Sequence, residues 1–133
     1  MKVADVMTKD VLWLEADEPI SLAVWTMAAD FISGAPVRDH TGKLVGVLTN
    51  TDLAREAAPV VKKKVSSLMS TSVVSITEDA PLVDAAGILA ERSVHRIVVT
   101  NSSGAVVGVV TALDVLRGLH LSGSLSAATA VPT

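Results

Sequence analysis

The chain has 133 residues, a formal net charge of −3, no cysteine, and 50% hydrophobic residues against only 2% aromatic ones. This composition excludes disulfides and thiolate metal sites, and the acidic balance argues against a nucleic-acid binder, which carries a basic face. Since no apolar run reaches the ~18–20 residues that span a bilayer, and the first residues lack an apolar signal segment, we expect a cytoplasmic protein acting on neither membranes nor nucleic acid.

In the first half, the residues predict a strand, a helix, a hairpin and a second helix. The strand covers 11–15, and Asp17-Glu18-Pro19 opens the first helix, with acids and proline suited to a helix N-terminus. Gly34 is expected to end this helix. The apolar residues at helical spacing predict a buried stripe of Ile20, Ala23, Val24, Met27 and Phe31.

The hairpin is expected from strands at 35–38 and 44–49 that flank a turn ending at Gly42, where a positive φ is tolerated. The second helix is predicted at about 50–57. The second half copies this plan, with a strand at 73–77, a helix at 81–91, a hairpin turning at 101–104 and a helix at about 112–120. The inward residues of the helix at 81–91 are predicted to be Leu82, Ala85, Ala86 and Leu89.

The two halves are repeats. Residues 3–56 align without a gap on residues 65–118 at an offset of 62 (65 − 3), and Met7 then matches Met69 while Gly46 matches Gly108. We therefore predict a mixed α+β fold of two βαββα repeats, related by a pseudo-twofold and forming one compact module. Repeat 1 is assigned to 1–60, repeat 2 to 61–121, and a flexible tail to 122–133.

One motif in each repeat carries chemistry: Thr49 followed by Asp52, and Thr111 followed by Asp114, each at the passage from strand to helix. A helix N-terminus attracts phosphate, a Thr hydroxyl donates to a phosphate or ribose oxygen, and a carboxylate accepts from ribose hydroxyls. The same pair is also a helix-capping arrangement that needs no ligand. Arg55 and Arg117, three residues beyond the acids, are spaced for a local ion pair or a phosphate contact.

The ordered set of motifs resembles a pair of cystathionine-β-synthase-type (CBS) domains, also called a Bateman module, over residues 3–118. The resemblance rests on the segment 3–8 that leads into the first repeat, the segments 32–37 and 42–46, and both Gly-x-x-Thr-x-x-Asp units. It implies a βαββα fold per repeat, clefts between the repeats, and binding of adenosine-containing ligands such as AMP, ADP, ATP or S-adenosylmethionine. It also implies ribose or phosphate contacts for Thr49, Asp52, Thr111 and Asp114.

The repeats differ at the entrance to the hairpin, where His95-Arg96 stands against Ser33-Gly34. In the family that the chain resembles, a His-Arg pair here touches phosphates, and a guanidinium forks onto phosphate oxygens. The alternative is a pair at the helix exit on a solvated surface. Four apolar residues are candidate walls of a purine pocket, and they suit a core equally well: Val11, Val73, Ile32 and Val94.

These features favour a non-catalytic regulatory module that binds an adenosine ligand, has no tightly bound cofactor or metal, and signals to a separate partner. The alternative is a ligand-free dimerisation or scaffold protein with the same fold. The high apolar content makes a homodimer the expected assembly under either interpretation. Trp13 and Trp25, whose repeat counterparts are Ser75 and Gly87, are candidates for packing in the core or in a dimer interface, or for stacking on a base. An enzyme is disfavoured, because no nucleophile motif or phosphate-loop Gly-Lys is present.

Overall fold

A computed structural model describes residues 1–56 and 62–123 of the chain. The predicted end of the second helix at 57 and residues 124–133 of the predicted tail lie outside this part. The described residues divide into two compact units, one from residues 11–73 and one from residues 1–10 together with the chain from residue 74 onward.

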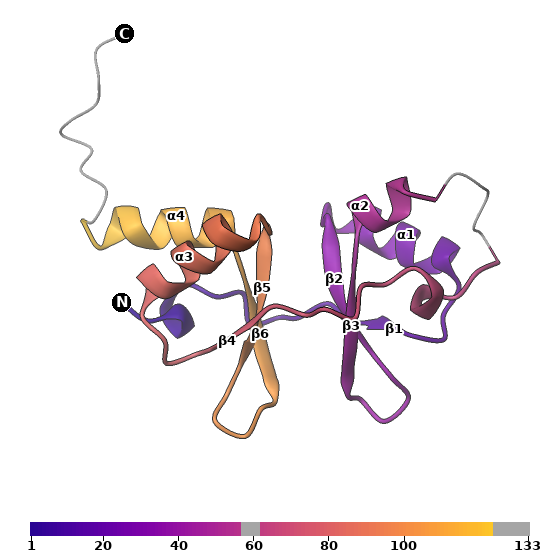
Figure 1. Ribbon diagram of the computed structural model, residues 1–133, viewed down its shortest axis with the longest axis horizontal. Helices are drawn as coiled ribbons and strands as arrows, with labels where there is room; N and C mark the ends of the chain where they lie inside the picture. The colour runs from indigo at the N-terminus through magenta and orange to yellow at the C-terminus, as the bar shows by residue number, and fades with distance from the viewer. Residues whose placement is uncertain (57–61, 124–133) are drawn as a thin grey trace, which may run out of the picture. The chain divides into compact units, whose positions relative to one another are not determined.

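In its described residues, the first-sheet unit, residues 11–73, contains one three-stranded sheet, two α-helices and a 3₁₀ turn. Figure 1 shows their arrangement. The elements of this unit are β1 (Leu14–Glu15), α1 (Ile20–Ala29), β2 (Gly34–Arg38), β3 (Leu44–Thr49), α2 (Asn50–Ala54) and η2 (Val65–Ser67). Strand β1 runs parallel to β2, and β2 pairs antiparallel with β3. Both helices lie on one side of the sheet.

The second-sheet unit repeats this plan. Its elements are η1 (Val3–Asp5), β4 (Ser75–Thr77), α3 (Leu82–Arg92), β5 (Arg96–Thr100), β6 (Val106–Thr111) and α4 (Ala112–Leu121). Strand β4 is parallel to β5, and β5 is antiparallel to β6. The predicted hairpins are confirmed, and Gly42 and Gly104 take φ values of +87° and +83° in their turns. The mixed α+β class is thereby confirmed.

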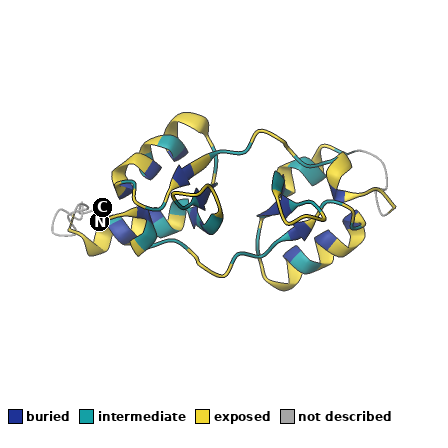
Figure 2. Ribbon diagram, turned by 90° about the horizontal axis from the view of Figure 1, so that it is seen from below, coloured by how far each residue is buried: buried dark blue, intermediate teal, exposed yellow. Residues whose placement is uncertain are grey.

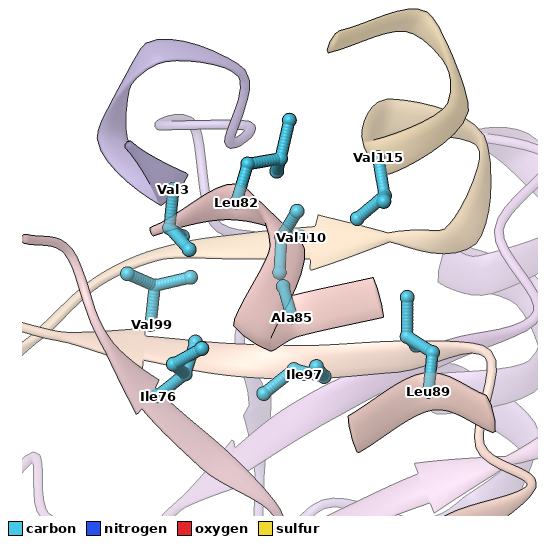
Figure 3. Packing of buried hydrophobic residues seen from close by; sticks show 9 residues of the cluster. All are labelled: Val3, Ile76, Leu82, Ala85, Leu89, Ile97, Val99, Val110 and Val115. Atoms are coloured by element: carbon cyan, nitrogen blue, oxygen red, sulfur yellow. The ribbon is translucent and has the colours of Figure 1, made fainter. Parts of the chain in front are cut away.

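Each unit has its own aliphatic core. In the first-sheet unit, Ile20, Ala23 and Met27 of α1 are buried against Val37 and Leu48 of the sheet. The second-sheet core contains Val3, Ile76, Leu82, Ala85, Leu89, Ile97, Val99, Val110 and Val115 (Figure 3). Val3 belongs to η1, so the start of the chain completes the core of a sheet built from the second half.

The leading segments of the two repeats are exchanged. In the second-sheet unit, Thr8 forms a bridge with Val109 of β6, and the Val3 N–H donates to the Ala80 carbonyl at 2.9 Å. In the first-sheet unit, Ser70 likewise bridges to Val47 of β3. Each sheet therefore receives the segment that leads into the other repeat, and the compact units do not follow the repeat boundaries of the sequence.

The predicted stripe of α1 is correct for Ile20, Ala23 and Met27 and wrong for Val24 and Phe31, which are 42% and 97% exposed. Helix α1 ends at Ala29, and Gly34 already belongs to β2, so Gly34 does not end the helix. The chain leaves the helix through Phe31 in a left-handed conformation, with φ of 55°. Since α1 is apolar on every side, its periodicity could not separate buried from exposed positions.

Candidate functional site

The N-terminus of α4 is held by a reciprocal cap. Thr111 closes β6 in an extended conformation, and its Oγ1 accepts a hydrogen bond from the Asp114 N–H at 3.1 Å. In return, the Thr111 N–H donates to Asp114 Oδ2 at 3.0 Å. The capping interpretation of the motif is therefore confirmed here, because both side chains satisfy backbone groups that a helix end leaves unpaired.

The first repeat builds the same cap in front of a shorter helix. The Thr49 N–H donates to Asp52 Oδ2 at 2.9 Å, and Thr49 Oγ1 accepts from the Asp52 N–H at 3.2 Å. Thr49 Oγ1 also donates to Asp52 Oδ2 at 3.0 Å. Helix α2 has five residues where α4 has ten, so fewer aligned peptide dipoles stand behind this N-terminus.

Capping leaves part of each motif available to a ligand. Within the described residues, Oδ1 of Asp52 and Oδ1 of Asp114 accept no hydrogen bond. The Thr111 hydroxyl donates none there either, whereas the Thr49 hydroxyl already donates to Asp52. The second copy thus keeps one hydroxyl donor and one carboxylate acceptor side by side, a combination that suits the hydroxyl groups of a ribose.

The same end of the second hairpin also holds the His-Arg pair. Arg96 opens β5 directly opposite Thr111, and the Ala112 N–H donates to the His95 carbonyl at 3.1 Å. The structure therefore brings His95, Arg96, Thr111 and Asp114 together. His95 is exposed, but Arg96 is half-buried, and this burial lowers the pKa of its guanidinium. Because its guanidinium is partly desolvated and lies beside a helix N-terminus, Arg96 is better suited to bind an anion than an arginine on a fully solvated surface.

The first repeat has the same backbone geometry without the cation. Gly34 opens β2 opposite Thr49, and the Asn50 N–H donates to the Ser33 carbonyl at 2.8 Å. Arg55, which follows α2, forms no ion pair with Asp52 in the described part of the chain, and Arg117 forms none with Asp114. The predicted local ion pairs at this spacing are therefore absent there.

The four residues proposed as walls of a purine pocket lie in different environments. Ile32 and Val94 precede β2 and β5 and pack against the cores of their units, as the core alternative expected. Val11 and Val73 are half-buried and stand at the two ends of the first-sheet unit. Their role at a ligand pocket stays a prediction.

The sequence analysis did not predict that the backbone of the two exchanged segments lies beside β6 and β3, the strands that carry the Thr-Asp motifs. Thr8 pairs with Val109 two residues before Thr111, and Ser70 pairs with Val47 two residues before Thr49. The signal was present in the repeated Met and Gly positions, which these segments bring into contact. In the described residues, no group of three His or acidic side chains is placed to hold a metal ion, and no helix is long and apolar enough to cross a membrane.

The comparison with protein families decides the classification. The CBS domain model matches residues 3–59 and again residues 65–121, which together form most of the chain. This protein belongs to the CBS domain family. The CBS pair is also similar to an uncharacterised protein, MJ1232, and to an inosine-5'-monophosphate dehydrogenase, both of Methanocaldococcus jannaschii. Identities are 34% over 88% of the chain and 31% over 87%, and the chain spans 39% and 23% of those two proteins.

Solved CBS pairs share the fold. The structure of CBSX2, a CBS-pair protein of Arabidopsis thaliana, in complex with AMP is 25% identical with a TM-score of 0.79, covering 91% of this chain and 97% of that one. The CBS domain pair of protein MJ0100, in complex with 5'-methylthioadenosine and S-adenosyl-L-methionine, is 26% identical with a TM-score of 0.81. That match covers 92% of this chain and 98% of the other.

Proposed function

We propose that this CBS pair is a non-catalytic regulatory module that binds an adenosine-containing ligand and signals its occupancy to a partner. The observation that carries the proposal is the group of Arg96, Thr111 and Asp114 at one end of the β5–β6 hairpin, beside the N-terminus of α4. The binding of AMP by CBSX2, and of S-adenosylmethionine and methylthioadenosine by the MJ0100 pair, supports this ligand class.

Each group has a distinct role in the proposed site. Asp114 Oδ1 accepts hydrogen bonds from ribose hydroxyls while Oδ2 keeps its cap. The Thr111 hydroxyl donates to ribose or phosphate, and the half-buried Arg96 pairs with a phosphate or carboxylate of the ligand. His95 adds a donor that becomes stronger when the imidazole is protonated. Val94 is the proposed apolar contact of the base in this copy.

The first copy is the weaker site of the two in this proposal. Thr49 and Asp52 carry the same roles, with Ile32 and Val11 as apolar contacts. The Thr49 hydroxyl, however, must leave Asp52 before it can donate to a ligand. No cation stands at the position of Arg96, because Gly34 occupies it.

Output to a partner requires that the ligand bind two conformations or assemblies unequally. We propose a cytoplasmic homodimer as the assembly, since large apolar side chains are exposed on the helices of both units. The alternative is a dimerisation scaffold that binds no ligand. The complete capping boxes favour it, because they give both Thr-Asp pairs a structural role without any ligand.

Thermal unfolding with AMP, ADP, ATP and S-adenosylmethionine, each added separately at millimolar concentration, tests the proposal. A ligand present at 100 times its Kd adds about 2.7 kcal/mol to the free energy of unfolding, which raises Tm by several degrees for a chain of this size. The rise should vanish in Asp114→Ala and persist in Asp84→Ala, which removes an exposed acid from the first turn of α3. Asp52→Ala should reduce it less.

Each variant is compared with its own ligand-free Tm, because Asp114→Ala also removes one cap hydrogen bond. An absence of any rise with all four ligands in the unmodified protein would favour the scaffold. A rise that survives in both Asp114→Ala and Asp52→Ala would place the ligand elsewhere. Conversion of ATP to product during incubation would contradict the non-catalytic assignment.

A further inference from the structure

The sulfur chemistry of this chain is confined to thioethers, because it contains four methionines and no cysteine. Two of the methionines, Met7 and Met69, occupy equivalent positions in the repeats, one on each exchanged segment. Met7 packs against the core of the second-sheet unit and Met69 against the core of the first-sheet unit. The same arrangement of a methionine against a sheet is therefore built twice.

The sulfur atom of each methionine lies against a glycine of the adjacent strand. A Cβ on Gly108 of β6 would lie 2.7 Å from Met7 Sδ, and a Cβ on Gly46 of β3 would lie 2.8 Å from Met69 Sδ. A contact packed this closely does not accept an additional heavy atom unless one of the partners moves. A covalent addition to either sulfur would therefore disturb the contact between the exchanged segment and its strand.

The four methionines differ in their access to solvent. Met7 and Met69 are half-buried, whereas Met27 is 2% exposed and Met1 is 53% exposed. Met27 lies on the inner side of α1, and Figure 2 shows that the helices have one buried and one exposed side. A small oxidant in water can thus approach Met7 and Met69 while Met27 is enclosed by the core. These two residues combine partial access with a close backbone contact.

We propose that Met7 and Met69 are sites of oxidation by hydrogen peroxide, and that their sulfoxides release Thr8 and Ser70 from the adjacent strands. A lone pair of the thioether sulfur attacks one peroxide oxygen, and the O–O bond breaks. The departing hydroxide takes the proton of the transferred oxygen and becomes water, so that sulfur is oxidised and peroxide is reduced. The product is a polar, chiral side chain. This inference does not depend on ligand binding.

The sulfoxide weakens the contact in either of its possible positions. If the side chain stays in place, its new oxygen crowds the glycine and brings a polar atom against an apolar core. If the side chain turns outward, the core loses the packing of the methionine. The next residue of each segment pairs with the strand: the Val109 N–H donates to the Thr8 carbonyl at 3.0 Å. The Val47 N–H likewise donates to the Ser70 carbonyl at 2.9 Å. These two hydrogen bonds should open first.

Peptide mapping by mass spectrometry, after graded treatment of the folded protein with hydrogen peroxide, tests whether the two sites are modified. Met7 and Met69 should both be converted to sulfoxides while Met27 remains a thioether. Met1, which is exposed, reports that the oxidant is active. Oxidation of Met7 and Met69 only together with Met27 would show that they react after unfolding, and it would overturn the proposal.

Amide hydrogen exchange, measured residue by residue by NMR, tests the release. In the oxidised protein, exchange of the Val109 and Val47 amides should become at least about tenfold faster, since overpacking a close contact shifts an equilibrium by about one to two powers of ten. The Asn101 and Asp39 amides, which are hydrogen-bonded within the hairpin turns, should keep their rates. Unchanged exchange at Val109 and Val47, or equal acceleration of all four amides, would overturn the proposal.

Two leucine variants assign the effect to each sulfur, because leucine keeps a similar apolar volume without an oxidisable atom. After oxidation, Met7→Leu should keep the protection of the Val109 amide and lose that of Val47, and Met69→Leu should show the reverse. Each variant is compared with its own unoxidised form. Faster exchange at Val109 in oxidised Met7→Leu would overturn the proposal. So would a failure of methionine sulfoxide reductases for both epimers to restore protection in the oxidised unmodified protein.

Discussion

Gly108 of β6 lacks a side chain because Met7 occupies the space that a side chain would need. A Cβ at Gly108 would lie 2.7 Å from the Met7 Sδ and 2.8 Å from the Thr8 carbonyl oxygen. Gly46 of β3 stands in the same relation to Met69 and Ser70, at 2.8 Å and 2.7 Å. The glycine and the methionine that recur in the two repeats are thus contact partners, and each pair joins one residue from each repeat.

Gly108→Ala should destabilise the protein by about 1–3 kcal/mol, the usual cost of overpacking a close contact. The Met7 side chain can move, but the carbonyl of Thr8 is tied to β6 by the bridge to Val109. Urea denaturation gives the free energy of unfolding. The matched control is Gly87→Ala in α3, where a Cβ meets nothing within 4 Å. It should stabilise the helix by about 0.5–1 kcal/mol, and equal effects of the two variants would contradict the contact.

Thr111→Ala should lower the free energy of unfolding by about 0.5–2 kcal/mol, because the Asp114 N–H loses its acceptor. Thr111→Ser keeps the hydroxyl and should recover most of this stability. Chemical denaturation of both variants measures the difference. An alanine variant as stable as the serine variant would show that the cap is not used in solution.

Asp39 makes the turn of the first hairpin sensitive to pH. Its Oδ1 accepts from the Thr41 hydroxyl at 2.5 Å and from the backbone N–H groups of Thr41 and Lys43 at 2.9 Å and 3.1 Å. The hydrogen bond from the Thr41 side chain is the main cause that lowers the pKa of Asp39 below 3.8, followed by that from Lys43. The stabilisation is therefore complete above the unfolded-state pKa and is lost as pH falls through the lower, folded-state pKa.

The second hairpin provides the control for this titration. Asn101 accepts from Ser103 and Ala105 in the same pattern and cannot titrate. In an NMR titration from pH 6 to pH 2, the amides of Thr41 and Lys43 should shift together below the usual range of an Asp pKa, while those of Ser103 and Ala105 stay in place. Asp39→Asn should abolish the shift. Equal movement in both turns would indicate global acid unfolding.

Arg96→Gln should weaken binding of AMP and ATP while leaving the affinity for adenosine unchanged, since only the phosphates pair with a guanidinium. Loss of a charge-assisted hydrogen bond of about 1.5–3 kcal/mol corresponds to a ten- to hundredfold rise in Kd. Isothermal titration calorimetry measures all three ligands. Arg92→Gln, at the exposed end of α3, is the control for net charge. A uniform loss across the three ligands would assign Arg96 to structure.

The hairpins and caps could be predicted because their signals are local. A glycine three residues after Asp39 or Asn101 specifies the turn, and Thr followed by Asp at the third position specifies the helix start. The outward side of α1 could not be predicted, because Val24 and Phe31 are as apolar as the residues that fill the core. The exchange of leading segments was harder to predict, because the repeated Met and Gly positions indicate a shared role without showing which methionine contacts which glycine.

The candidate site was likewise predictable only in part. The grouping of Arg96 with Thr111 follows from strand pairing that the hairpin turn determines. The difference between the two Thr hydroxyls depends on side-chain geometry that identical motifs do not encode. The repeats were assigned to residues 1–60 and 61–121, and the compact units of the structure are residues 11–73 and residues 1–10 together with the chain from residue 74 onward.

The exchange also bears on how such a chain could arise by duplication. In this chain each sheet is completed by the leading segment of the other repeat, so a polypeptide with one repeat would need that segment from a second molecule to make the same contacts. Two separate single-repeat copies would therefore associate as a segment-swapped dimer. Fusion of their genes would make the same contacts intramolecular. By the same logic, removal of the first ten residues of this protein should destabilise the second-sheet unit, whose core and strand β6 they contact, although that unit is built from the other end of the sequence.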